Sequence, residues 1–213
     1  MNFVKANTSD YTHINIPIPS STSSSSIRRG TSPPIYFVDF EAITNIHDTF
    51  TEFPIAEDHS MIFLIGIIVG DTFHSYLAQS MSPEEEHRIL VNMLDCIDPR
   101  GLIYYWGNAE KTLLNRAAMK FPDLTSRIQA LRLIDLCTVF RLEGFVLENL
   151  MNYGLKHVSR VLFEAGYINT TWPETSYIKD GLCAMIEALK CYNKTINITD
   201  EEDIFSHIIE YNY

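Results

Sequence analysis

Apolar residues along the chain gather in five short runs that are rich in β-branched and aromatic side chains, which is the pattern of β-strands. These runs are residues 35–40, 61–69, 72–77, 102–106 and 131–134. Two prolines before the first run favour an extended entry, and Gly70-Asp71 predicts a tight turn between the second and third runs. We therefore expect three consecutive strands, followed later in the chain by two more.

Apolar residues at helical spacing follow the third and fourth runs. Ser82 is expected to cap the first of these helices, with Glu85 completing a capping box. The second helix is expected to begin just after Asn108. Thr199 and Glu202 form another capping-box pattern, which predicts that a last helix starts there and runs toward the C-terminus.

The predicted order of elements is three strands, a helix, a strand, a helix, a strand and then helices. A meander followed by a helix and a parallel strand is typical of a mixed sheet with helices on its faces. We therefore predict an α/β fold with a ribonuclease-H-like mixed five-stranded sheet, a three-strand meander plus two parallel strands, with helices on both faces. No G-x-G-x-x-G motif follows the first strand, which disfavours a dinucleotide-binding fold.

The chain of 213 residues changes character at residue 35. Residues 1–34 are rich in serine and have few apolar anchors, so we predict a disordered tail followed by one domain over residues 35–213. No stretch reaches the roughly 18 apolar residues of a membrane-spanning helix. The N-terminus lacks the charged-then-apolar layout of a signal peptide, so we expect an intracellular protein, cytoplasmic or nuclear, that is not secreted.

Charge is distributed unevenly along the chain. The formal net charge of −11 argues, as an average, against a protein that coats nucleic acid. Residues 35–99 contain one basic and twelve acidic residues, whereas residues 100–160 contain nine basic and five acidic ones. The cations of this middle segment either lie on ordinary solvated helix faces or contact a phosphate backbone. Seven are candidates: Lys111, Arg116, Lys120, Arg127, Arg132, Lys156 and Arg160.

Two acidic residues end the first apolar run. Asp39 and Glu41 are two positions apart, so in a strand both carboxylates project from one face. Two anions in an apolar strand are costly unless something compensates them, and a divalent cation with a preference for oxygen ligands is the usual compensation. The alternative is that the strand ends at Phe40 and both acids lie in a solvated loop.

A third acid, Glu110, follows the fourth apolar run and opens the second predicted helix. A carboxylate in that position can face the C-terminal end of a parallel strand, where ligands of α/β proteins usually bind. The alternative is an acid that only favours the dipole in the first turn of a helix.

Five segments together resemble the DEDD 3′–5′ exonucleases, and most closely the YprB-like, RecB-associated branch of predicted nucleases. The segments are VDFE, YYWGNAEKTLLNRA, RLIDLCTVFR, YGLKHVSRVL and IIEYNY. The resemblance covers roughly residues 35–213, nearly all of the predicted domain. It implies a ribonuclease-H-like fold and hydrolysis of phosphodiester bonds.

The resemblance also implies a site. Two Mg²⁺ or Mn²⁺ ions, about 3.5–4 Å apart, would be held by Asp39, Glu41, Glu110 and a further aspartate. Tyr211 would orient the attacking water, and Asp135 matches a recurring acid that orients its neighbours or caps a helix. Because several carboxylates converge, at least one should have a raised pKa in the absence of metal.

Candidate residues for substrate binding are indicated by their closeness to Glu110 in the sequence and by the resemblance to the nuclease family. Lys111 adjoins Glu110, Lys156 lies in the YGLKHV segment, and Asn108 precedes the second helix, so these three are the expected contacts to a single-stranded DNA or RNA substrate. Trp106 is a further candidate for stacking on bases. The alternative for an aromatic residue inside a strand is a place in the core.

The chain departs from the family pattern at its end. The family closes with a tyrosine, three residues and the last metal-binding aspartate, but here Tyr211 is followed by two residues only. If the natural protein ends there, another acid substitutes, one metal is bound weakly, or the protein is an inactive relative. If the sequence is a fragment, truncated at its last motif, the missing residues restore the site. Asp180 and the acids of residues 200–203 are conceivable substitutes, although a loop acid and a helix-start acid are the simpler interpretations.

Three functions remain open at this level. The leading prediction is a metal-dependent nuclease, a 3′–5′ exonuclease acting on single strands. The second is a catalytically impaired ribonuclease-H-like module that binds nucleic acid or serves as a scaffold. The third, a phosphohydrolase with Asp39 as nucleophile, is disfavoured because the D-x-D-x-T/V run that it requires is absent.

Overall fold

The structure of the protein is a computed structural model. It describes residues 32–44, 60–144, 147–172, 176–194 and 198–212, with the side chains of residues 198–202 left out. Residues 33–213 form one compact unit. The predicted tail, residues 1–34, lies almost wholly outside the described residues.

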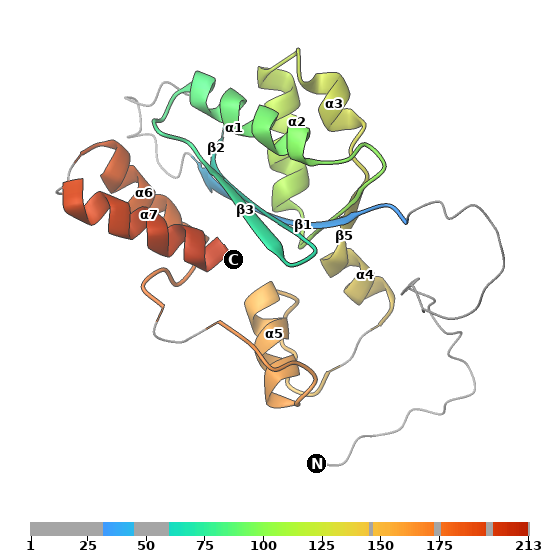
Figure 1. Cartoon of the computed structure of the whole chain (residues 1–213). Coiled ribbons are helices and arrows are strands. Elements are labelled where there is room, and N and C mark those ends of the chain that lie inside the picture. The colour runs from blue at the N-terminus through green and yellow to red at the C-terminus, as the bar shows by residue number, and fades with distance from the viewer. Residues whose placement is uncertain (1–31, 45–59, 145–146, 173–175, 195–197, 213) are drawn as a thin grey trace. The chain divides into compact units, whose positions relative to one another are not determined.

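A mixed five-stranded sheet forms the centre of this unit (Figure 1). Its spatial order is β3-β2-β1-β4-β5, with β1 antiparallel to β2, β2 antiparallel to β3, and β4 parallel to both β1 and β5. The predicted meander plus two parallel strands is confirmed. The strands are β1 (Ile35–Ile43), β2 (Met61–Val69), β3 (Thr72–Leu77), β4 (Leu102–Tyr105) and β5 (Leu133–Asp135).

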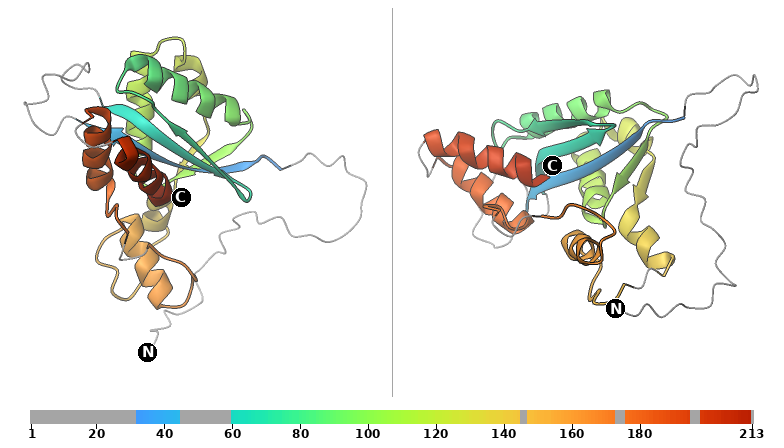
Figure 2. Two further views of the ribbon diagram at one scale, coloured as in Figure 1. Left: turned by 60° about the vertical axis from the view of Figure 1, so that its left-hand side comes forward. Right: turned by 60° about the horizontal axis from the view of Figure 1, so that its bottom comes forward.

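Helices cover both faces of the sheet, as the sequence predicts. Figures 1 and 2 show α1, α2 and α3 together on one side, with α5, α6 and α7 on the other. The predicted cap of the last helix is wrong, because α7 begins at Ile198 and Thr199 lies inside it. The helices are α1 (Pro83–Cys96), α2 (Ala109–Lys120), α3 (Thr125–Gln129), α4 (Leu136–Leu142), α5 (Leu155–Glu164), α6 (Gly181–Tyr192) and α7 (Ile198–Asn212).

The two faces of β1 differ in how far they are covered. Tyr36, Val38 and Phe40 alternate along the strand and are all buried in the core. On the other face, Ile35 and Phe37 remain 42% and 49% exposed. That face is therefore covered only toward the C-terminal end of β1, where α6 and α7 contact the strand.

A buried ion pair joins the two helices on the fully covered face. Glu86 of α1 pairs with Lys120 of α2, and their side chains are only 3% and 15% exposed. The Glu86 carboxylate also accepts a hydrogen bond of 3.0 Å from the backbone N–H of Ile62 in β2, and Lys120 donates one of 2.8 Å to the carbonyl of Ser60. The pair thus fixes α1 and α2 to the start of β2.

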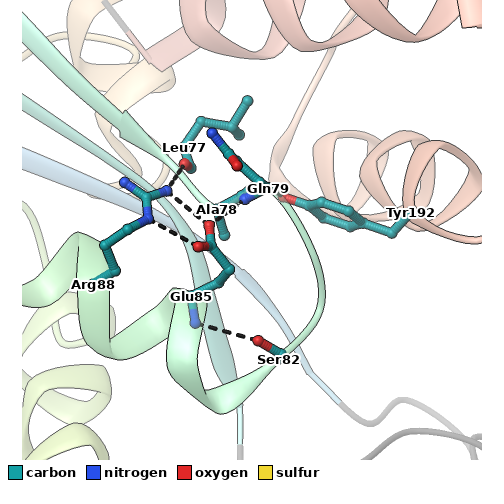
Figure 3. Close-up of polar contacts among 7 residues, drawn as sticks. All are labelled: Leu77, Ala78, Gln79, Ser82, Glu85, Arg88 and Tyr192. Carbon is teal, nitrogen blue, oxygen red and sulfur yellow. Dashed lines mark hydrogen bonds and ion pairs between the residues drawn. The ribbon is translucent and has the colours of Figure 1, made fainter.

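The N-terminus of α1 is capped as predicted, but only in part (Figure 3). The Ser82 hydroxyl accepts a hydrogen bond from the backbone N–H of Glu85. The Glu85 carboxylate does not complete a capping box; it accepts from the backbone N–H of Gln79 and pairs with Arg88. Arg88 also donates to the carbonyl of Leu77, so the cap binds the end of β3 to α1.

Candidate metal-binding site

Asp39 and Glu41 lie within β1, not in a loop. The strand continues to Ile43, so the alternative of a strand ending at Phe40 is wrong. A β-bulge falls between Glu41 and Ala42, directly after the second acid. Glu41 is 6% exposed, and Asp39 keeps contact with solvent.

Glu110 reaches these two acids from α2. It stands in the first turn of the helix and is 4% exposed, and its side chain is hydrogen-bonded to that of Asp39. Helix α2 begins where β4 ends, and β4 is the parallel neighbour of β1. The C-terminal ends of two parallel strands therefore bring the three predicted acids together, as in other α/β sites.

The three carboxyl groups have raised pKa values. Burial raises the pKa of Glu41 to about 8, and the charges of Asp39 and Glu110 add to this effect. Asp39 is an exposed residue, yet the protein packed around its carboxylate raises the pKa of that group above its usual value. Burial also raises the pKa of Glu110, followed by the charge of Asp39. A raised pKa was expected from repulsion among converging carboxylates, but burial is the largest cause for each of the three, and repulsion adds to it for Glu41 and Glu110.

Asn212, at the end of α7, completes the group and was not predicted. Its side-chain amide donates a hydrogen bond of 3.0 Å to Oδ2 of Asp39 and is also bonded to Glu41. Gly66 makes room for it, because a Cβ atom there would lie 1.9 Å from the Asn212 side-chain oxygen. Gly66 is paired with Asp39 across the sheet. An isolated glycine in an otherwise apolar strand was the available signal for such a close approach.

The side chain of Lys156 lies beside the acids. Lys156, near the start of α5, has its Nζ 4.3 Å from the centre of the Tyr211 ring, and it donates a hydrogen bond to the carbonyl of Lys179. Burial lowers its pKa, against the opposing attraction of Asp180, Glu41 and Asp39. Lys156 therefore lies at the site, as predicted.

Tyr211 lies at the site as well. Burial and then the charges of Glu41 and Asp39 raise the pKa of Tyr211 above its ordinary value of 10, so its hydroxyl stays protonated. A protonated phenol can donate a hydrogen bond to an anion or a water.

Two buried oxygen atoms at the site have no hydrogen-bond donor among the described residues. They are Oε2 of Glu110 and Oδ1 of Asn212. Unpaired buried acceptors are costly, and a divalent cation is a suitable partner for oxygen atoms of this kind. In the part of the chain that the structure describes, no three His, Cys, Asp or Glu side chains have the spacing of a formed metal site. The donor set, all oxygen and with excess negative charge, fits Mg²⁺ or Mn²⁺.

Comparison with known proteins gives one match. The model of a family described as a domain of unknown function, DUF2779, matches residues 36–154, more than half of the chain. The protein belongs to this family. No curated protein and no solved structure matches the chain.

The part that matches DUF2779 contains β1, β4 and the start of α2, and with them Asp39, Glu41 and Glu110. Lys156, Tyr211 and Asn212 lie beyond it. Among the described residues of this DUF2779 protein, no helix combines the length and the apolar character needed to cross a membrane.

The remaining candidates lie in different surroundings. Asp135 caps α4 through the N–H and hydroxyl of Thr138, and also accepts from the N–H of Gly107. Asp180 caps α6 by accepting from the N–H of Cys183, which is the simpler interpretation of that acid. Lys111 and Asn108 are both exposed at the start of α2, and their contact with substrate stays a prediction.

The stability of the metal-free protein should fall as the pH rises. An ordinary glutamate titrates at 4.5, whereas Glu41 in the folded protein titrates at about 8. Between these values the folded protein holds more protons than the unfolded chain, so the free energy of unfolding should decrease with increasing pH. Urea unfolding in EDTA at pH 5 and pH 8 measures this. The difference should shrink in Glu41→Gln, and an equal difference in both proteins would contradict the assignment.

Replacing Gly66 by alanine should move Asn212 away from Asp39. The added methyl group overlaps the Asn212 amide, so we expect a loss of about 1–3 kcal/mol in the free energy of unfolding, the usual cost of overpacking. The double variant Gly66→Ala/Asn212→Ala removes the overlap and should recover most of that loss. Equal losses in the single and double variants would show that the contact is not responsible.

Proposed function

We propose that the protein is a metal-dependent nuclease that hydrolyses phosphodiester bonds, acting as a 3′–5′ exonuclease on single strands of DNA or RNA. The observation that carries this proposal is the convergence of Asp39, Glu41 and Glu110, with raised pKa values and an unpaired buried oxygen on Glu110. A cluster of anions at the ends of parallel strands is unfavourable alone and favourable around Mg²⁺ or Mn²⁺.

Each residue of the site has a role in this proposal. Asp39, Glu41 and Glu110 would hold the metal, and the chemistry that it would supply is activation of a water and stabilisation of negative charge at the phosphate. Asn212 fixes the orientation of the Asp39 carboxylate through its amide. Tyr211, protonated and close to the acids, is placed to donate a hydrogen bond to the attacking water.

Lys156 adds a positive charge on the α5 side of the site. Its ammonium group contacts the carbonyl of Lys179 and the Tyr211 ring, and the charges of Asp180, Glu41 and Asp39 act on it from nearby. A cation in this position can contact a phosphate oxygen of the substrate next to the bond that is cleaved.

A direct assay tests the proposal. Single-stranded DNA and RNA, labelled at the 5′ end, are incubated with the purified protein in Mn²⁺ or in EDTA, beside a Glu110→Gln variant. We expect a ladder of shortened products with the wild-type protein in Mn²⁺ and none in EDTA or with the variant. Intact substrate under all conditions, or equal digestion by the variant, would contradict the proposal.

A second candidate is a module that binds nucleic acid without hydrolysing it. Two observations favour it: the fourth side chain at the acids is the neutral amide of Asn212, and no three described His, Cys, Asp or Glu side chains have metal-site spacing. Binding of labelled strands without any Mn²⁺-dependent shortening would support this function over the nuclease.

A further inference from the structure

Three hollows in the surface share the side chain of Trp172. The first, of about 220 Å³, includes Phe37 and Asp39 in its lining. The second, of about 430 Å³, is lined by Asp39 and Arg160 among others, and the third, of about 560 Å³, by Arg160 and Lys156 but not Asp39. Asp39 also lines both the first and the second hollow, and Arg160 lines both the second and the third, so the hollows lie next to one another. Together they lead from the open face of the sheet, past Asp39, to α5, and we call them the channel.

The end of this channel over the sheet is aromatic. Phe37 is 49% exposed, and its ring stacks on that of Tyr104 at 5.6 Å between centres. Trp106 lines the same hollow; its indole N–H is bonded to the carbonyl of Tyr153 and its ring packs against Phe140. Ring faces held in place beside an acidic site are suited to stacking with unpaired nucleobases.

At the other end of the channel lies Arg160, a cation for which the described residues provide no ion pair. Arg160 is exposed on α5, and no ion pair to it is found among the described residues, Glu164 at i+4 included. Most of the other candidate cations are engaged elsewhere: Lys120 pairs with Glu86, and Arg127 pairs with Asp95 at 2.6 Å. Of the seven basic residues named from the sequence, Arg160 and Lys156 line the channel.

We propose that this channel binds one single strand of nucleic acid, with Arg160 contacting a backbone phosphate and the indole of Trp172 stacking on a base next to the acidic site. The inference rests on the proposed function, which already takes single strands, and names the path of the strand and two residues that would bind it. A duplex hides the faces of its bases, whereas a single strand offers both exposed bases and phosphates along one path. Asp180 also lines the channel but is engaged as the cap of α6.

Binding without hydrolysis tests the channel. Fluorescence anisotropy in EDTA, at 50 mM and 150 mM salt, gives the affinity of the full chain for fluorescein-labelled dT12, U12 and a 12-bp DNA duplex. Arg160→Glu should weaken binding of dT12 about ten-fold at the lower salt and reduce its salt dependence. Trp172→Ala should weaken it about five-fold or more, while Trp172→Phe, which keeps a stacking ring, should stay within two-fold of wild type.

A matched control comes from another cation of the same segment. Arg127→Glu reverses the same charge on α3, outside the lining of the three hollows, and should leave the affinity for dT12 within two-fold of wild type. Arg160 is exposed, so its variant tests the proposal even if Trp172→Ala does not fold. Wild-type affinity in Arg160→Glu, absence of binding to any strand, or equal affinity for the duplex would overturn the proposal.

The outcomes separate this inference from the nuclease function. A protein that binds dT12 through Arg160 and Trp172 but never shortens it would contradict the nuclease function and support binding in the channel. A protein that shortens strands in Mn²⁺, but whose Arg160→Glu and Trp172→Ala variants bind like wild type, would support the nuclease function and contradict binding in the channel.

Discussion

Replacing Asp39 by asparagine should lower the rate of Mn²⁺-dependent hydrolysis by about a thousand-fold or more. The change removes one negative charge and keeps the shape of the side chain. Its main effect should therefore be weaker binding of the metal that the three acids would hold. Loss of a metal's electrostatic stabilisation costs several kcal/mol of the activation free energy, and each 1.36 kcal/mol is about ten-fold in rate. Initial rates with a labelled single strand measure the effect.

Two controls separate a lost charge from a lost fold. Asp98→Asn makes the same substitution at a surface residue that pairs with Arg100 at 3.0 Å, and it should keep the wild-type rate within about two-fold. In EDTA at pH 8, Asp39→Asn should be at least as stable as wild type, because the folded state disfavours the charge that is removed. A variant that keeps more than about a tenth of the wild-type rate would rule out Asp39 as a metal ligand.

The largest expected effect on stability is that of Lys120→Met. Removing one partner of a buried ion pair leaves the other as a buried charge, which costs about 3–5 kcal/mol. The Glu86 carboxylate would keep the hydrogen bond from the Ile62 N–H but lose the ammonium group that it contacts. Urea unfolding at pH 7 measures the loss.

The double variant Glu86→Leu/Lys120→Met is the matched comparison. Apolar side chains of similar volume in place of both partners often cost little, so the double variant should be more stable than Lys120→Met alone. If the single variant loses less than about 1 kcal/mol, the pair does not hold α1 and α2 together as inferred.

The strands could be predicted from the sequence because the patterns that indicate them involve only neighbouring residues. β2 and β3 begin and end where the apolar and alternating patterns do, and Gly70 supplies the turn between them with a φ of 58°. β1 extends three residues past the predicted Phe40 because residues 41–43 continue the pairing with β2. Asn212, 173 residues from Asp39 in the sequence, is hydrogen-bonded to it, and no local pattern can indicate that contact.

The acids of the site were predictable for a similar reason, and their surroundings were not. The D-x-E pattern in β1 places two carboxylates on one face, and the order of strand and helix places Glu110 beside them. The position of Lys156 over the Tyr211 ring depends on how α5 packs against the end of α7, which the sequence does not encode locally. The same holds for Trp172, whose indole N–H reaches the carbonyl of Tyr211 at 3.5 Å.

Charge was the least informative property when averaged over the chain. A net charge of −11 argues against nucleic acid, yet in the structure some cations of the basic middle segment pair with acids and two others line the channel. Which group each cation contacts depends on its neighbours in three dimensions. A count of basic residues in the sequence therefore gives the number of positive charges but not their partners.

The close approach of Asn212 to Gly66 offers a way to recognise relatives that retain this site. Gly66 pairs with Asp39 on the adjacent antiparallel strand, so the two positions together form a pattern: an acid-x-acid pair within one apolar strand, and a glycine interrupting the next. A chain that keeps the acids but has a larger residue at the glycine position has no room for the amide of an asparagine placed as Asn212 is. In such a chain we expect a different side chain beside the first acid.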